Sequence, residues 1–289
     1  MGSSTINLYY RLTKPGIIYG NLYTGAAGFL FGSRGGIDIR GLVAVLVGTA
    51  LVIASACVVN NITDIKIDKK MDRTKKRSLV SGQISVTHAT LFASILGVSG
   101  FAILISWVNW LTVLVGVIGY VDYTIAYALA KRHTPHSTLI GSISGATPIL
   151  AGYTGATGML HAEAIILFLT MVIWQMPHFY AIGLFQRKDY KKAGIPLLTE
   201  KTSHKRMVQI MCLYIVLYGL SAITLGLIGA KLHFLYMIGM SVISLWWLKV
   251  GLDGWRARDT EAWARQVFKR SLVVLLIFSI SVALAYRLP

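Results

Sequence analysis

The chain has 289 residues, of which 55% are hydrophobic and only 13% are charged, and its mean hydropathy is +0.64. Soluble domains carry about 25% charged residues, so this composition excludes an ordinary soluble protein and predicts an all-α, polytopic membrane bundle. The net charge of +17 would favour nucleic acid in a soluble domain, but here we attribute it to the basic cytoplasmic loops that orient membrane proteins. We therefore expect the lipid bilayer as a partner and no nucleic acid.

Apolar stretches near the ~20 residues that cross a bilayer as a helix recur along the sequence. They predict about nine transmembrane helices, at 16–33, 40–59, 86–106, 108–130, 138–158, 161–186, 207–229, 231–249 and 268–286. We expect a single membrane-embedded domain, 1–289, with a central cavity opening to the cytoplasmic loops. Its pseudo-repeat halves would be 1–135 and 136–289. Cys57 and Cys212 fall inside apolar stretches, which indicates packing residues rather than a disulfide or zinc site.

Basic residues are distributed unevenly between the two ends of these helices. The segments at one end hold 24 of the 28 Lys and Arg residues, and the remaining four are Arg34, Arg40, Lys231 and Arg287. Because Lys and Arg concentrate in cytoplasmic loops, the N-terminus is expected inside and the C-terminus outside. The first residues do not resemble a cleaved targeting segment, so the expected location is a bacterial cytoplasmic (inner) membrane with the polar loops in the cytoplasm.

The first predicted span contains small residues and one amide. Glycines four residues apart let helix backbones approach closely, and such pairs occur at Gly16/Gly20, Gly28/Gly32 and, in the fifth span, Gly141/Gly145. Asn21 lies soon after Lys14-Pro15. An amide within a membrane helix faces either protein or a polar cavity, and both roles stay open for Asn21.

The segment Asn60–Arg77 carries an unusual row of acceptors. Asp64, Asp68 and Asp72 recur every four residues, and Asn60 lies four residues before the first of them. On a continuing helix these side chains share one face, about 6 Å apart, where their mutual repulsion requires a cation. Seven bases accompany them: Lys66, Lys69, Lys70, Arg73, Lys75, Lys76 and Arg77. Oxygen ligands beside bases suit a Mg²⁺-diphosphate, and the strict spacing favours that interpretation over a solvated charged loop.

The fourth predicted span ends in a tyrosine series and a basic pair: Tyr120, Tyr123 and Tyr127 precede Lys131-Arg132-His133. The tyrosines are three and four residues apart, so a regular helix would place them on one face. An interfacial aromatic belt with flanking positive charge is the alternative. Asp122 lies within this span, where an acid is costly unless it is paired or functional.

The sixth predicted span contains Trp174-Gln175-Met176-Pro177-His178, and Arg187-Lys188-Asp189 follow its end. Proline bends a helix and leaves a carbonyl unpaired, so Gln175 and His178 beside it are expected to line a cavity. A hydrogen-bonded core histidine is the alternative. Asp189 stands among bases as the acids of the first loop do, which predicts that the two loops form two sides of one site.

These motifs resemble those of the UbiA-type intramembrane prenyltransferases. The segment Asn60-Asn61-x-x-Asp64-x-x-x-Asp68-x-x-Met71-Asp72-Arg73-Thr74 is similar to their first aspartate-rich motif, in the form found in the branch that farnesylates protoheme IX. Thr13–Ile18 with Gly20–Leu22, Lys131–His133, Gly141–Ala146 and Trp174–His178 are further matches, so the resemblance covers essentially the whole chain. Only Asp189, followed by Tyr190, remains of the family's second motif, which leaves the number of Mg²⁺ ions at one or two.

The resemblance implies transfer of a farnesyl group from farnesyl diphosphate to a vinyl group of haem B, with addition of water, to give haem O and diphosphate. It assigns Mg²⁺ binding to Asn60, Asp64, Asp68 and Asp72, and catalytic roles to Asp64, Asp68, Lys131 and Arg132. Binding of the substrates is assigned to Lys14, Asn21, Arg73, Arg77, Tyr127, Trp174, Gln175, His178, Arg187, Lys188 and Asp189.

His178 is the candidate for contact with haem, including ligation of its iron, since imidazole suits iron. A terminal oxidase or a downstream haem-modifying enzyme is a further expected partner. Two other functions fit the residues: prenylation of a quinone-precursor aromatic acid, and secondary transport. Transporters place ionisable groups near the bilayer midplane, whereas the acids here concentrate at span ends.

Overall fold

The structure, a computed structural model, describes residues 4–34, 36–229 and 234–286, and within these ranges it contains helices and turns but no strand. The elements are α1 (Thr5–Leu12), α2 (Pro15–Gly32), α3 (Ile39–Thr63), α4 (Ile65–Asp68), α5 (Val86–Trp107), α6 (Trp110–Val121), the π-helical turn η1 (Asp122–Ala126), α7 (Tyr127–His133), α8 (Ser137–Thr157), α9 (Ala162–Phe185), α10 (Arg187–Ala193), α11 (Leu198–Lys201), α12 (His204–Ile228), α13 (Phe234–Leu252), the 3₁₀ turn η2 (Asp253–Arg256) and α14 (Thr260–Leu284).

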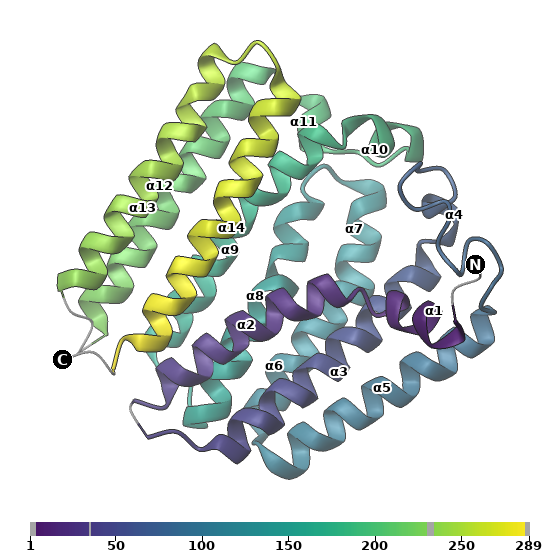
Figure 1. Ribbon diagram of the computed structural model, residues 1–289, viewed down its shortest axis with the longest axis horizontal. Helices are drawn as coiled ribbons and strands as arrows, with labels where there is room; N and C mark the ends of the chain where they lie inside the picture. Colours follow the sequence, from purple (N-terminus) through teal and green to yellow (C-terminus); the bar gives the residue numbers. More distant parts are fainter. Residues whose placement is uncertain (1–3, 35, 230–233, 287–289) are drawn as a thin grey trace.

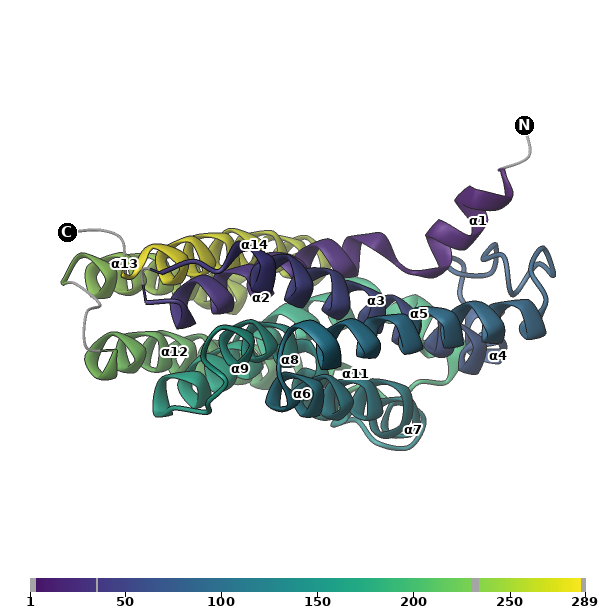
Figure 2. The ribbon, with the colours of Figure 1, turned by 90° about the horizontal axis from the view of Figure 1, so that it is seen from below.

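The long helices form a bundle in which α2, α13 and α14 lie in one layer and α8, α9 and α12 in the other (Figure 2). Helix α9 is central, because it packs against α8, α12 and α14. The short helices α4, α10 and α11 gather at one end of the bundle (Figure 1). The predicted all-α membrane fold is thus confirmed, and its polar connections lie together rather than being scattered over the surface.

Seven helices among the described residues are long and apolar enough to cross a membrane, so the chain is an integral membrane protein. Helices α2 and α8 match two further predicted spans in position. Their Gly, Ser and Thr residues make them less hydrophobic than the seven candidate spans. The predicted count of nine spans is therefore not confirmed. Lys231, Arg287 and the start of the predicted 231–249 span lie outside the described residues.

Glycines let α2 and α8 cross with their backbones in contact. A methyl group on Gly152 would lie 1.9 Å from the carbonyl oxygen of Gly25, and one on Gly28 would lie 2.0 Å from that of Ile149. The close approach predicted from glycine spacing is confirmed for the pair Gly28/Gly32. It is wrong for Gly16 and Gly20, where nothing lies within 4 Å of the added carbon.

Replacing Gly152 with alanine is expected to separate α2 from α8 and to lower the free energy of unfolding by about 1–3 kcal/mol, the usual cost of overpacking. The measurement is the thermal unfolding midpoint of the purified protein in detergent. Gly20→Ala is the matched control, since its new methyl group meets no neighbour and alanine is the better helix former. Equal midpoints for the two variants would contradict this assignment of the contact.

Candidate active site at the loop end of the bundle

The acid row begins at the end of α3 and does not continue as a helix. Asp64 caps α3, Asp68 ends the single turn of α4, and both residues are buried, whereas Asp72 lies in the turns that follow and is exposed. The predicted continuous face of three acids is therefore wrong. The physical reason is that like charges four residues apart repel along a helix, whereas the turns let each carboxylate approach a different cation.

Each of the three carboxylates has its own basic partner. Asp64 accepts a hydrogen bond from the Lys131 ammonium of α7. Asp68 lies 2.6 Å from Nη1 of Arg77, which also donates to Asn61 Oδ1 at 3.2 Å. The first pair is almost fully enclosed, since the Lys131 and Asp64 side chains are 7% and 10% exposed. Such a pair is stable only when both charges are present, because either one alone would be buried without compensation.

Asp72 belongs to a more exposed part of the site, where it pairs with Lys75 and Lys192. The hydrogen bonds from Lys192 and Lys75 lower the pKa of the Asp72 carboxyl to about 2.

Lys14 reaches the same place from the start of α2. Its backbone has a φ of +53°, a conformation that residues with side chains adopt rarely and mostly where surrounding contacts enforce it. Its Nζ donates to Asn60 Oδ1 at 2.9 Å, and burial lowers the pKa of the Lys14 ammonium to about 8. Lys14, Asn60, Asp64, Asp68, Arg77 and Lys131 form what we call the polar cluster.

Two atoms of the polar cluster are enclosed without a hydrogen-bond partner: Asn60 Nδ2 and Asp64 Oδ1. Arg132 Nη2 lies 3.7 Å from this Asp64 oxygen, beyond hydrogen-bond distance. Mg²⁺ takes oxygen ligands and is commonly held by one or two carboxylates together with substrate phosphates and water. The free oxygen of Asp64 and the carboxylate of Asp68 fit that donor set. No group of three acids, histidines or cysteines at metal-binding distance occurs among the described residues, so the four predicted ligands do not form a preassembled cage.

Helix α10 docks onto the turns that follow Asp68. The Asp189 carboxylate accepts hydrogen bonds from the backbone N–H groups of Asp72, at 3.3 Å, and Arg73, at 3.4 Å. An apolar cluster seals the same junction and includes Met71, Ala193 and Ile195. The two loops predicted to form one site are thus in direct contact. In this arrangement Asp189 is an acceptor for backbone rather than a partner of the bases around it.

The π-helical turn η1 decides which tyrosines face the site. A π turn includes one more residue than an α turn, so the helix beyond Asp122 is rotated relative to α6. Tyr123 and Tyr127 stack with their ring centroids 5.7 Å apart, and Lys131 Nζ lies 5.3 Å from the Tyr127 centroid. Tyr120 instead faces Ser55, with its hydroxyl 3.3 Å from that serine's Oγ. The prediction of a single tyrosine face is therefore wrong.

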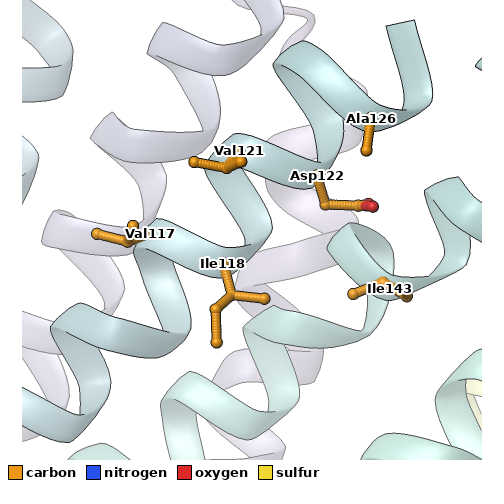
Figure 3. A pocket seen from close by; sticks show the side chains of 6 residues that line it. All are labelled: Val117, Ile118, Val121, Asp122, Ala126 and Ile143. Atoms are coloured by element: carbon orange, nitrogen blue, oxygen red, sulfur yellow. The ribbon is translucent and has the colours of Figure 1, made fainter. Parts of the chain in front are cut away.

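Asp122 ties this turn to α8. Its Oδ2 accepts a hydrogen bond from the backbone N–H of Ser144 at 3.0 Å. Figure 3 shows its carboxylate beside α8, at a pocket of about 400 Å³ lined by Val117, Ile118, Val121, Asp122, Ala126 and Ile143. The cost of an acid inside a span is thus offset by a backbone partner, and the pair holds η1 in register with α8.

Helix α9 runs through Pro177 without ending and supplies three predicted site residues. The Gln175 amide donates to the carbonyl of Ser142 on α8 and to that of Met171 in its own helix, so one of these bonds joins α9 to α8. Trp174 Nε1 donates to the carbonyl of Ser271 on α14 at 3.0 Å, and His178 Nδ1 lies 2.7 Å from the hydroxyl oxygen of the same serine.

Several predicted residues lie outside the polar cluster. Asn21 donates to the carbonyl of Ile17 in its own helix, and Arg132 donates to the carbonyl of Thr63. Arg187 and Lys188 are exposed on α10, and their side chains have no hydrogen bond or ion pair in the described part of the chain. Their roles toward a substrate stay predictions.

Three residues of the site were not singled out from the sequence: Asn61, Lys192 and Ser271. Asn61 stands next to Asn60 in the acid motif, and Lys192 belongs to the same basic loop as Asp189, so local sequence offered a signal for both. Ser271 offered none, because its partner His178 is 93 residues away.

The model of the UbiA prenyltransferase family matches residues 21–273 of this chain. The chain belongs to this family. It is 42% identical over 286 residues to a protoheme IX farnesyltransferase of Pectobacterium atrosepticum, covering 98% of this chain and 96% of that one. The corresponding protein of Enterobacter sp. (strain 638) is 40% identical over 282 residues, with 97% and 95% covered.

Solved structures of the UbiA family have the same fold. A structure from work on digeranylgeranylglyceryl phosphate synthase superimposes with a TM-score of 0.80 at 21% identity and covers 97% of this chain and 98% of that one. A UbiA homologue of Archaeoglobus fulgidus, bound to GPP and Mg²⁺, gives a TM-score of 0.73 at 15% identity, covering 95% and 99%. Membership of a prenyltransferase family removes the secondary-transporter interpretation.

Replacing Lys131 with methionine is expected to lower the free energy of unfolding by on the order of 3 kcal/mol, because Asp64 then keeps a buried charge without its closest partner. The measurement is denaturation of the purified protein in mixed micelles. Adding Asp64→Asn to Lys131→Met removes the orphaned charge and is expected to recover most of the loss. If the double variant is as unstable as the sum of the single variants, the two side chains are not energetically coupled.

Proposed function

We propose that this protein transfers the farnesyl group of farnesyl diphosphate to a vinyl group of haem B, with addition of water, to yield haem O and diphosphate. The observation that carries the proposal is identity of 40–42% to named protoheme IX farnesyltransferases over at least 95% of both chains. The polar cluster supports it, because it combines carboxylates with bases at the end of an apolar bundle. Prenylation of a quinone-precursor aromatic acid fits the family as well but has no comparable support.

The ion pairs of the polar cluster suit exchange with a charged substrate. When bound, Mg²⁺ would be held by Asp64 and Asp68 with Asn60 beside them. It would neutralise the diphosphate oxygens and stabilise the leaving group. Lys131 and Arg77, released from these carboxylates, would then donate to the diphosphate oxygens, and Lys14 would supply a third cation. Each carboxylate would thus exchange its basic partner for Mg²⁺, and each base would exchange its carboxylate for the diphosphate. No buried charge would be left without a partner.

The reaction needs charge separation in a site from which water is largely excluded. The carbon–oxygen bond to diphosphate breaks with its electron pair leaving on oxygen, and the vinyl π electrons form the new carbon–carbon bond. Water then adds to the cationic carbon beside the porphyrin and loses a proton. The stacked Tyr123 and Tyr127 lie next to Lys131, and aromatic faces stabilise a nearby cation, so they are suited to guide the farnesyl group.

We infer that the haem lies on the α9 side, where His178 stands about two helical turns, and Trp174 about three, before the loop end of that helix. We place the polar loops in the cytoplasm and the protein in a bacterial inner membrane. The distribution of basic residues and the bacterial relatives support this location. Docking of a terminal oxidase or a downstream haem-modifying enzyme on the basic loops, and a division into pseudo-repeat halves, stay predictions.

Replacing Asp64 or Asp68 with alanine is expected to reduce haem O formation by at least about 100-fold, since metal and base together stabilise the departing diphosphate. The assay combines purified protein, haem B, farnesyl diphosphate and Mg²⁺, with products resolved by mass spectrometry. Asp253→Ala is the control, because that acid is exposed in η2, outside the polar cluster. Turnover retained by both cluster variants would refute the metal assignment. No haem O from the wild-type protein would refute the proposed function.

Replacing Asp189 with alanine is expected to raise the KM for farnesyl diphosphate more than it lowers kcat. Its carboxylate holds the backbone of Asp72 and Arg73, so its loss loosens the loop that binds the diphosphate without removing a group of the polar cluster. Steady-state kinetics at varied farnesyl diphosphate concentration measure the split. Glu200→Ala, which removes an acid from the nearby helix α11, serves as the control. A loss confined to kcat would instead place Asp189 in the chemical step.

A further inference from the structure

Ser271 joins two helices at the side chain of His178. It is fully buried on α14, and it contacts α9 through two groups: its carbonyl accepts from Trp174 Nε1 at 3.0 Å, and its hydroxyl oxygen lies 2.7 Å from His178 Nδ1. The hydroxyl also donates to the carbonyl of Phe268, one turn earlier, at 2.6 Å. The hydroxyl of Ser271 therefore has two polar partners, and its carbonyl has a third.

These contacts determine where the imidazole carries its proton. A serine hydroxyl has one hydrogen, and here that hydrogen is directed to the Phe268 carbonyl, so Ser271 Oγ must accept from Nδ1–H of His178. No acid among the described residues contacts the ring, and a buried charge without a partner is costly, so the imidazole is neutral. In the neutral ring with Nδ1 protonated, Nε2 holds a free lone pair.

The ring is also held in orientation by aromatic neighbours. The centroid of His178 lies 4.8 Å from that of Trp174, with 27° between the planes, and 4.8 Å from that of Phe268, with 37° between the planes. His178 keeps 9% of its surface exposed, and its Nε2 has no hydrogen-bond partner within the described ranges. A neutral imidazole held against aromatic rings, bonded through one nitrogen and open at the other, is the arrangement that proteins use to present a ligand to a metal.

We propose that Ser271 is a positioning residue that keeps His178 protonated on Nδ1, so that His178 Nε2 binds the iron of the haem substrate as an axial ligand. This inference rests on the proposed function, since it takes haem B to be the acceptor. Ligation would fix the porphyrin plane relative to α9 and hold a vinyl group toward the polar cluster. A base that activates water is the other use of Nε2, but the ring lacks the carboxylate that stabilises an imidazolium in such sites.

The test is titration of the full-length protein in nanodiscs with ferric haem B, followed by its absorption and electron paramagnetic resonance spectra. We expect an imidazole-ligated spectrum from the wild-type protein. His178→Ala should lose that spectrum, and millimolar imidazole should restore it. Ser271→Ala should weaken haem binding by about 10-fold, as loss of an outer hydrogen bond to a metal-bound histidine commonly does, while Mg²⁺-farnesyl diphosphate binding and the thermal midpoint stay near wild type.

The decisive comparison is the double variant His178→Ala/Ser271→Ala. If Ser271 acts only through His178, its substitution adds no further loss of haem affinity once the imidazole is absent. Ser244→Ala is the matched control, because Ser244 is a buried serine on α13 whose hydroxyl has no hydrogen-bond partner. It should bind haem as the wild type does.

Two outcomes would overturn the inference: a wild-type spectrum in His178→Ala, or an undiminished Ser271→Ala effect in the double variant. A spectrum unchanged in His178→Ala together with lost haem O formation would instead assign Nε2 to the chemistry of water addition. Failure of the proposed function is separate from both, since it would appear as absence of haem O formation by the wild-type protein.

Discussion

The charge pairs at the loop end of the bundle are the constraint on which the site depends. Asp64 and Lys131 are enclosed, and in such surroundings an isolated charge would cost several kcal/mol. The chain can therefore carry acids there only if bases are brought to them. Lys131 of α7 pairs with Asp64, and Arg77 in the turns after α4 pairs with Asp68, while Lys14 at the start of α2 donates to Asn60 beside them. The same charges that stabilise the folded cluster are the charges that a Mg²⁺-diphosphate requires.

Close helix packing fixes the positions of these basic side chains. Gly28 and Gly152 let α2 and α8 meet backbone to backbone, which fixes the position from which Lys14 reaches Asn60. On the other side of α8, the bond from Ser144 to Asp122 holds the π turn. That turn rotates α7 so that Lys131 faces Asp64. Small residues and one buried acid, remote from the reacting groups, thereby set the geometry of the polar cluster.

The haem side depends on another kind of constraint. Among the described residues no charge pair involves His178, and the order here comes from one serine and two aromatic rings that restrict a neutral imidazole. Trp174 and His178 lie on the same face of α9, one turn apart, and Ser271 of α14 bonds to both. The two sides of the proposed site thus differ as their proposed substrates do, since a diphosphate is multiply charged and a porphyrin is largely apolar.

The sequence by itself determined the membrane class, the approximate position of the long helices and the motifs of the site, because hydropathy and charge spacing are local properties. It also indicated that Asp64 and Asp189 belong to one end of the molecule. It failed where the outcome depends on contacts between distant segments. The acid row was predicted as one helix face, but Asp72 turns away to Lys192; the three tyrosines were predicted on one face, but the π turn separates Tyr120. Only the tertiary structure decided these arrangements and revealed Ser271, because burial of a charge or a ring is settled by which helices pack together.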